Sequence, residues 1–588
     1  MKTTYRKIWR IFTSDQKRKV ALLLFAMVFG AVLETISLGL VLPLLGTIFQ
    51  PDAVKEYSFI QPFLRQFKTV GSFQIVLALA ALLAVLFSLK NFYLSWLIYF
   101  QSTFVFELRK QISNDIYRKY LTQPYAFFVK RNTSNFIHII QTETTQFANV
   151  VIAPLLMLAT EILVFICVFI FVVSVVSWNS LSAIIIPTLA SVFFYTLLKR
   201  RLRIWGEKRY FHETMRVKNI QHGFGGIKDI KVMGRERDFL NEFDFHNHQS
   251  ARYLVRSNVA SQLPRLLIET FGVIAVLFLV YQFKLLDKSL DELALSLGFF
   301  GVALIRLAPS ASRILSALNK MRYGDVTVNK IFDAINVSDA MNSTVVINKE
   351  SVSKLSFEEN LKINNISFSY SAGQRPVFVD LSLQINVGSS VGVVGKSGEG
   401  KSTLVNILLG LLQPQTGTIL ADGDDIFSNL RDWQNRIGYV SQQVYLSDDT
   451  LRRNIAFGVV PSEIDEQRIL SVVKMAKLEE VVSGLDAGLD TEVGERGIRL
   501  SGGQQQRIGL ARALYHKPSF MILDEATSGL DLKTENAVLR VISALHGSVT
   551  TLIISHRMNT LKNCDVIFEI SEGRVSKLKN CDEYGELK

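Results

Sequence analysis

The residue types and spacing needed to hold the phosphates of a nucleotide occur together in one segment, Gly395-Lys396-Ser397-Gly398-Glu399-Gly400-Lys401-Ser402. Glycines let a backbone approach a phosphate closely, and the amides of such a loop then point at the phosphate oxygens. The ammonium of Lys401 would reach the β- and γ-phosphates, and the hydroxyl of Ser402 would ligate Mg²⁺. The segment therefore predicts a site for ATP and Mg²⁺.

A strand and a helix are needed to position this loop. The apolar run 390–394 indicates a buried strand before the loop, and 403–409 indicates a helix after it, whose N-terminus favours anions. A glycine-rich turn without a ligand is the alternative, but it gives no reason for a strand, a loop and a helix in this order.

Two acids end a second apolar run, 521–525. In a phosphate-loop fold the first acid, Asp524, would orient Mg²⁺ or its waters. The second acid, Glu525, is placed to polarise an attacking water. A strand that ends in solvated acids is the alternative, and the upstream phosphate loop argues against it.

A second anion site is indicated where 500–504, Leu-Ser-Gly-Gly-Gln, opens a helix. Together with the phosphate loop, this segment resembles the signature of the ATP-binding-cassette (ABC) superfamily, and the resemblance covers the whole chain. The segment 491–497 also resembles the X-loop of exporters. Ser441 and Gly529 stand where the family commonly has proline and alanine, and both departures look tolerable.

The resemblance implies roles for further residues. Tyr370 would stack on adenine, Gln442 would sense Mg²⁺ and the membrane domain, Asp531 belongs to the D-loop, and His556 would contact the γ-phosphate. The implied catalytic residues are Glu525, His556 and Gln442, and the implied Mg²⁺ ligands are Ser402, Gln442 and Asp524. The implied nucleotide-binding residues are Tyr370, Gly395, Lys396, Ser397, Gly398, Glu399, Gly400, Lys401, Ser402, Thr403, Gln442, Asp524, Ser501, Gly502, Gly503, Gln504 and Asp531.

The rest of the chain has the composition of a membrane protein. Apolar residues make up 49% of the 588 residues and charged residues 20%, and the mean hydropathy is +0.25. Six apolar spans are each near the roughly 20 residues that cross a bilayer as a helix. They lie at 20–48, 76–100, 147–176, 180–198, 258–283 and 293–315.

The net charge of +13 gathers in 1–19 and 199–265, beside the spans. This is the positive-inside pattern, so we expect a membrane and no nucleic acid as partner. The apolar stretch after the basic N-terminus is too long for a signal peptide. The three cysteines are not at metal-ligand spacing.

These observations predict a polytopic α-helical membrane domain of exporter type with six transmembrane helices, followed by an α/β P-loop ABC nucleotide-binding domain. We place the membrane domain at 1–320, a linker at 321–358 and the nucleotide-binding domain at 359–588. Six crossings put the N-terminus and the P-loop domain on the same, cytoplasmic side of the inner membrane. Residues 50–74 suggest either a short interfacial helix or a loop on the other side.

Helical patterns continue beyond the bilayer in 101–146 and 199–257. Each is interrupted, near 124–131 and near 225–235, and a turn at 178–180 separates the third and fourth spans. Because a family member clamps each ATP between the P-loop of one domain and the signature of another, a chain with one of each implies a homodimer. The two interruptions resemble coupling helices, and plain loops are the alternative.

Charged residues inside the spans suggest a site for cargo. Charge in a bilayer is costly, so such residues usually face a cavity or a partner. Glu34 could simply pair with a base, but four cations are harder to neutralise in this way. We expect Lys90, Arg265, Arg306 and Arg313 to line a cavity for an anionic head group such as a pyrophosphate. Snorkelling at a helix end is the alternative for Arg265 and Arg313.

Short stretches of the membrane half, at 34–35, 42–43, 226–236 and 306–310, are similar to PglK-type flippases. That resemblance implies transport of a polyprenyl-pyrophosphate-linked oligosaccharide. Export of peptides, drugs or other lipids is the alternative within the class. A nucleotide-gated channel is disfavoured because Glu525 and His556 are present, and a soluble ATPase acting on nucleic acid is disfavoured by the six spans.

Overall fold

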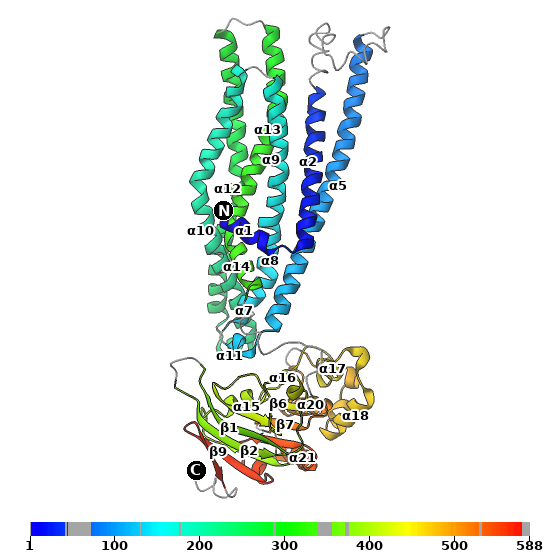
Figure 1. Cartoon of the computed structure of the whole chain (residues 1–588), viewed down its shortest axis with the longest axis vertical. Helices are drawn as coiled ribbons and strands as arrows, with labels where there is room; N and C mark the ends of the chain where they lie inside the picture. Colours follow the sequence, from blue (N-terminus) through cyan, green and yellow to red (C-terminus); the bar gives the residue numbers. More distant parts are fainter. Residues whose placement is uncertain are drawn as a thin grey trace. The chain divides into compact units, whose positions relative to one another are not determined.

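The structure is a computed structural model of the 588-residue chain. It describes residues 2–41, 44, 72–129, 131–175, 178–285, 290–337, 355–370, 375–494, 497–527 and 532–578. The chain divides into two compact units, of which Figure 1 shows the elements. The first unit is Met1–Gln123 with Lys130–Asp339, and the second is Ala340–Lys588 with Pro124–Val129.

The first unit is helical throughout its described part. Its α-helices are α1 (Lys2–Ile11), α2 (Ser14–Gly39), α5 (Ser72–Leu121), α7 (Thr133–Ile137), α8 (Thr144–Gln146), α9 (Ala153–Val175), α10 (Trp178–Gly225), α11 (Ile227–Met233), α12 (Glu236–Leu285), α13 (Leu290–Tyr323) and α14 (Asp325–Ile335). Two π-helical turns, η2 (His138–Glu143) and η3 (Phe147–Ile152), interrupt the run between α7 and α9.

All six predicted spans overlap helices of this unit. Four described helical stretches are long and apolar enough to cross a membrane: Ser14–Gly39, Val76–Leu121, Thr133–Phe171 and Glu236–Phe278. The predicted fourth and sixth spans lie on α10 and α13, and the number six stays a prediction. The predicted turn at 178–180 is wrong, because these residues form the first turn of α10.

The predicted extensions and interruptions of the long helices are confirmed. α5 continues to Leu121, α10 continues to Gly225, and α12 begins at Glu236. Pro124, which cannot continue a helix, precedes the short α6 (Tyr125–Val129). Gly234 ends α11 in the left-handed region at φ +63°, which only glycine adopts without strain.

The stretch 321–358 is not a simple linker in its described part. α13 continues to Tyr323, and α14 follows within the first unit. The segment was assigned to the linker because polar and charged residues interrupt the apolar spans there, but the apolar residues of α14 fall on one helical face. That face, with Val328 and Ile331, is buried. The predicted interfacial helix at 50–74 lies outside the described residues except for 72–74, which begin α5.

The second unit has two sheets and covering helices. The six-stranded sheet has the order β10-β9-β3-β8-β7-β6, with parallel pairing from β9 to β6, and the antiparallel four-stranded sheet has the order β2-β1-β4-β5. The strands are β1 (Asn360–Phe368), β2 (Phe378–Asn386), β3 (Ser390–Val394), β4 (Thr416–Ala421), β5 (Asp424–Asp425), β6 (Ile437–Val440), β7 (Phe520–Asp524), β8 (Thr550–Ile554), β9 (Val566–Ser571) and β10 (Arg574–Leu578).

The helices of the second unit include one that comes from far away in the sequence. They are α6, α15 (Lys401–Leu408), α16 (Leu430–Asn435), α17 (Leu451–Ile455), α18 (Glu466–Met475), α19 (Glu479–Ser483), α20 (Gly502–Tyr515), α21 (Leu532–Ala544) and α22 (Met558–Leu561). Ala126 of α6 packs against the apolar core of this unit.

An aromatic cluster in that core packs α16 against β7 and the segment that precedes β1. The ring of Trp433 lies 5.5 Å from that of Phe357 and 5.8 Å from that of Phe520, and all three residues are buried. The Trp433 indole Nε1 donates a hydrogen bond of 2.7 Å to the carbonyl of Leu408, at the end of α15. The cluster therefore fixes the helix that follows the phosphate loop against β7.

Phe520→Ala tests this core. We expect the nucleotide-binding unit to lose about 3–5 kcal/mol of stability, because the variant leaves a cavity between Trp433 and Phe357. Differential scanning calorimetry of the full chain would show the lower transition. Leu470→Ala, at an exposed position of α18, is the control and should change stability by less than about 0.5 kcal/mol. Equal effects of the two substitutions would contradict the assignment of Phe520 to the core.

Candidate nucleotide-binding site

The phosphate loop connects β3 to α15, as the sequence predicts, and its shape requires glycine. Gly395, Gly398 and Gly400 have φ values of +154°, +89° and +100°. A Cβ on Gly400 would lie 2.7 Å from the side chain of Val377, and one on Gly395 would lie 2.5 Å from a backbone oxygen. A larger residue would therefore push the loop away from β9 at Gly395, or away from the start of β2 at Gly400.

Lys401 lies over this loop with its ammonium held by backbone oxygens. Its Nζ donates hydrogen bonds of 2.7 Å to the carbonyl of Gly395 and 2.9 Å to that of Lys396. Burial lowers the pKa of Lys401 below its ordinary value, although the nearby acids Glu525 and Asp524 act in the opposite direction. The ammonium is thus positioned between the loop and the acids at the end of β7.

Asp524 ends β7, and Glu525 follows it in an unusual backbone conformation. Glu525 has φ +49°, in the left-handed region that non-glycine residues seldom adopt. Its amide donates to the carbonyl of Ile554 at the end of β8, over 3.0 Å. Burial and the charge of Glu525 raise the pKa of Asp524, and Lys401 only partly offsets this rise. The left-handed conformation therefore places Glu525 beside the end of β8.

Three residues predicted to be catalytic come together beyond the ends of parallel strands. Gln442 follows β6, Glu525 follows β7 and His556 follows β8. Gln442 Nε2 donates a 2.7 Å hydrogen bond to Glu525 Oε2, and His556 Nε2 lies 3.5 Å from Glu525 Oε1. The carboxyl ends of parallel strands meet at one edge of a sheet, which is where open α/β sheets bind ligands.

The remaining nucleotide-binding positions surround the same loop. Tyr370 is partly exposed, and its hydroxyl lies 3.0 Å from the hydroxyl of Thr403, just after the loop. Glu399 accepts a 2.7 Å hydrogen bond from the amide of Glu572 and anchors the loop to the turn after β9. Ser402 is exposed at the start of α15.

These residues fit MgATP. The possible Mg²⁺ ligands are oxygen atoms: the hydroxyl of Ser402, the carboxylate of Asp524 and the amide oxygen of Gln442. Oxygen ligands of this kind suit Mg²⁺. Bound Mg²⁺ would neutralise charge on the phosphates. The glycine-rich backbone and Lys401 would hold the phosphates, and Glu525 would orient and polarise water at the γ-phosphate.

The signature lies on a different element from the phosphate loop. Ser501 caps α20, its hydroxyl accepts a hydrogen bond from the amide of Gln504, and the Gln504 side chain accepts one from the amide of Ser501. Gly502 and Gly503 form the first turn. α20 packs on β6, α17 and α18, whereas α15 packs on β7. Asp531 lies outside the described residues.

The cations predicted to line a cargo cavity are all paired with carboxylates. Lys90 Nζ lies 3.1 Å from Glu34 Oε1, and an Arg306 nitrogen lies 3.1 Å from Glu34 Oε2. Glu34 therefore serves two cations at once. Each of the four cations thus has a carboxylate partner, but Lys90 and Arg306 share a single one.

The two other cations form separate pairs. Arg313 pairs with Glu161 at 2.6 Å, and Arg265, which is exposed, pairs with Glu269 one turn away at 2.8 Å. Glu161, which also accepts a 2.7 Å hydrogen bond from Ser310, was not predicted from the sequence. Its position as an acid inside the third apolar span was the signal that could have revealed it.

Comparisons with known proteins agree with this architecture. The family model of the ABC transporter transmembrane region matches residues 19–302, and the ABC transporter model matches residues 378–528. A bacterial Atm1-family ABC exporter with ATP bound has the same fold, with a TM-score of 0.77 and 22% identity over 98% of this chain and 97% of the other.

Two relatives share the name ATP-dependent lipid A-core flippase. The protein from Wigglesworthia glossinidia brevipalpis is 28% identical over 99% of this chain and 96% of its own length. The protein from Cupriavidus metallidurans is 30% identical over 80% of both chains.

A helical membrane unit and a P-loop unit with these motifs define an ATP-driven membrane transporter of exporter type. The chain belongs to the ABC transporter family. It is an ATPase coupled to transport, a multi-pass protein of the inner membrane with its nucleotide-binding unit in the cytoplasm.

Glu525→Gln should lower ATP turnover by about 10²–10⁴-fold, because the amide cannot act as a general base. MgATP binding should remain, since Lys401 and the loop are unchanged. Phosphate release and nucleotide binding by the purified protein would measure both effects. Glu479→Gln, at an exposed position of α19, is the control and should hydrolyse ATP normally. Unchanged hydrolysis in Glu525→Gln would exclude this role.

The raised pKa of Asp524 predicts pH-dependent metal use. Only the ionised carboxylate ligates Mg²⁺, so the affinity for MgATP should fall as the pH falls through the raised pKa, above the ordinary value of about 3.9. Titration of nucleotide affinity against pH, with Mg²⁺ and with EDTA, would show a Mg²⁺-dependent decline. An identical pH profile in Asp524→Asn would contradict this assignment.

Proposed function

We propose that the protein is a homodimeric flippase that uses ATP hydrolysis to move an anionic lipid-linked glycan across the inner membrane. The preferred cargo is a polyprenyl-pyrophosphate-linked oligosaccharide. The observation that carries the choice of an anionic cargo is the excess positive charge around Glu34, inside the predicted spans.

The charge around Glu34 does not balance. Lys90 and Arg306 contribute two positive charges and Glu34 one negative charge, which leaves +1 in an apolar segment. Glu34 and Lys90 are buried, and Arg306 Nε is buried without a hydrogen-bond partner among the described residues. An uncompensated charge inside a membrane span is costly, and a bound anionic head group would offset this cost.

The two other cations do not contribute to this excess. Arg313 with Glu161 and Arg265 with Glu269 are balanced pairs. We therefore reduce the proposed head-group site to Lys90 and Arg306 as binding residues, with Glu34 positioning both of them. The exposed Arg265 becomes a natural control position.

The homodimer follows from the number of motifs. One chain has one phosphate loop, before α15, and one signature, at the start of α20. In the family the signature of one domain completes the ATP site of the other, so two chains make two complete sites. In this arrangement α11 would act as a coupling helix, and its exposed Val232 and Met233 are suited to apolar docking.

The identity of the cargo is supported by two resemblances. Relatives named lipid A-core flippases favour a lipid cargo. The stretches similar to PglK-type flippases, including Glu34 and Arg306 themselves, favour a pyrophosphate-linked glycan. An exporter of peptides, drugs or other lipids is the alternative.

Polyprenyl-pyrophosphate oligosaccharide should change the ATPase rate of the protein in lipid nanodiscs. Lys90→Met removes one positive charge and leaves Glu34 and Arg306 balanced. We expect the half-saturating lipid concentration to rise at least about tenfold, the effect of losing one charged hydrogen bond. Lys90→Met should still hydrolyse ATP without added lipid. Glu525→Gln should show no response of the ATPase rate to the lipid.

Arg265→Met is the matched control, because this exposed cation already has its own partner. Its lipid response should equal that of the unmodified protein. Robust hydrolysis that is indifferent to the lipid would reject this cargo and favour peptides, drugs or other lipids. ATP-dependent passive conductance in electrical recordings would reject transport in favour of a channel.

A further inference from the structure

A buried carboxylate that was not predicted from the sequence lies next to the segment that carries His556. This acid is Glu535, which belongs to α21 and is 2% exposed. A charged group so completely removed from water is costly unless it is paired and hydrogen-bonded. The partners of Glu535 therefore show what keeps the acid inside the second unit.

Both oxygens of this carboxylate are bound by residues that follow His556. Arg557 donates a 2.6 Å hydrogen bond to Glu535 Oε2, and Thr560 donates one of 3.1 Å to Glu535 Oε1. Arg557 is the residue directly after His556, and Thr560 lies in the short helix α22. Glu535 therefore attaches α21 at two points to the segment that begins with His556.

The other side of His556 is fixed at the end of β8. Ser555 is buried, and its hydroxyl accepts a 3.0 Å hydrogen bond from the amide of Arg557. A hydroxyl that accepts from the amide two residues later closes a small turn. His556 is the middle residue of this turn. One end of the turn is held by Ser555, and the other end is held by Glu535 through Arg557.

The segment after Glu525 joins the same network. Thr527 is buried, and its hydroxyl lies 3.4 Å from that of Thr560. The Thr560 hydroxyl has one hydrogen, which it donates to Glu535, so it accepts from Thr527. Glu535 is thus linked to the chain that follows Glu525 as well as to the chain that follows His556.

The two residues that this network supports face each other in the nucleotide site. His556 Nε2 lies 3.5 Å from Glu525 Oε1. At this distance no short hydrogen bond locks the two side chains together, so the segments that carry them determine their relative position. A misplacement of about 1 Å at a catalytic group can lower a rate by about 10²-fold.

A direct chemical role for Glu535 is excluded, because the acid is buried and both of its oxygens are bound. An ion pair that only joins α21 to α22 is the alternative. That alternative gives no reason for the network to include Arg557 beside His556 and Thr527 close to Glu525. The two attachments favour a role in placing the catalytic pair.

We propose that Glu535 is a positioning residue for ATP hydrolysis, which holds the turn of His556 against Glu525 through Arg557 and Thr560. The inference rests on the proposed catalytic roles of Glu525 and His556. Glu535 does not touch the nucleotide, and it acts on the rate of hydrolysis through His556. Loss of its charge releases Arg557 and lets the turn move away from Glu525.

Glu535→Gln removes the charge and keeps the size of the side chain. We expect kcat for ATP hydrolysis by the full chain in nanodiscs to fall about 10- to 100-fold, because His556 is misplaced. The KM for MgATP should change by less than about twofold, since Lys401 and the phosphate loop are unchanged. Arg557→Gln breaks the same contact from its half-buried side and should lower kcat in the same way.

The background of His556→Ala separates positioning from a merely structural role. His556→Ala alone should lower kcat. Adding Glu535→Gln to it should lower kcat further by less than about twofold, because residues that act as one unit are not additive. An ion pair that contributes only stability would lower kcat by the same factor in both backgrounds.

Asp432→Asn is the matched control, because Asp432 is also an acid paired with an arginine. It pairs with Arg436 at 3.5 Å, and both residues precede β6. They therefore lie at the edge of the sheet opposite to the nucleotide site, which is beyond the carboxyl ends of the parallel strands. Asp432→Asn should keep the kcat of the unmodified protein.

Normal kcat in Glu535→Gln and Arg557→Gln would overturn the proposal. So would equal losses of kcat in Glu535→Gln and Asp432→Asn, or a loss in Glu535→Gln that persists in full beside His556→Ala. Unchanged hydrolysis in His556→Ala would overturn it together with the catalytic role of His556, whereas the other outcomes would leave that role intact.

Discussion

Parallel pairing of β6, β7, β8 and β3 is the constraint on which the nucleotide site depends. It places the residues that follow these strands at one edge, although they are up to 161 positions apart in the chain. Gln442, Glu525 and His556 meet there. The aromatic core around Trp433 then holds α15, and with it Lys401, against the same edge. The order of the strands therefore determines which residues meet in the nucleotide site.

In the helical unit, the balance of charge between bases and acids determines which helices are held together. Where a base and an acid match, as in Arg313 with Glu161, the pair joins two helices. Where they do not match, as where Glu34 pairs with both Lys90 and Arg306, one positive charge is left over. Buried pairs of this kind contribute little net stability but are costly to break, so they specify which helices stay together.

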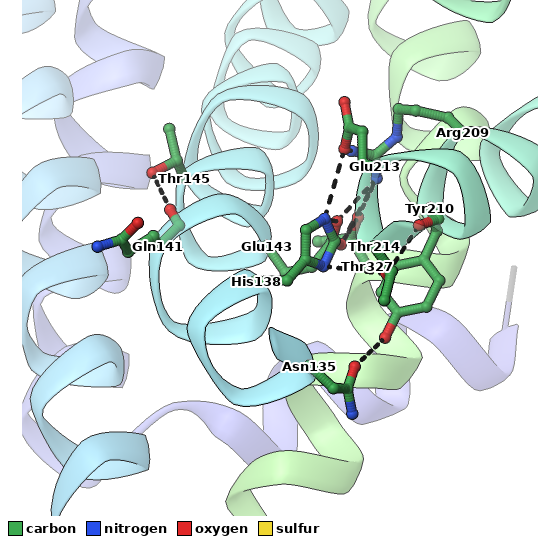
Figure 2. A network of polar contacts seen from close by, with 10 residues as sticks. All are labelled: Asn135, His138, Gln141, Glu143, Thr145, Arg209, Tyr210, Glu213, Thr214 and Thr327. Carbon is green, nitrogen blue, oxygen red and sulfur yellow. Dashed lines mark hydrogen bonds and ion pairs between the residues drawn. The ribbon is translucent and has the colours of Figure 1, made fainter. Parts of the chain in front are cut away.

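The sequence was most informative where chemistry and local structure depend on the same few residues. The strand predicted at 390–394 is β3, residue for residue, because it is wholly buried and bounded by a glycine-rich loop. The buried ion pair of Arg209 with Glu143 (Figure 2) was not predicted, because the two residues are 66 positions apart and nothing local marks the pair. The amphipathic α14 was taken for linker for a related reason, since its buried face is set by neighbours from distant segments.

The bonds that Lys401 makes to its own loop have a consequence for ligand selection. A phosphate that engages this ammonium replaces the carbonyls of Gly395 and Lys396, so it exchanges existing bonds instead of adding new ones. The exchange is favourable only for a group with greater negative charge than a carbonyl. A nucleotide that places no phosphate at Lys401 obtains no binding energy from this residue. The lysine would therefore favour a nucleotide that carries a β- or γ-phosphate over a monophosphate.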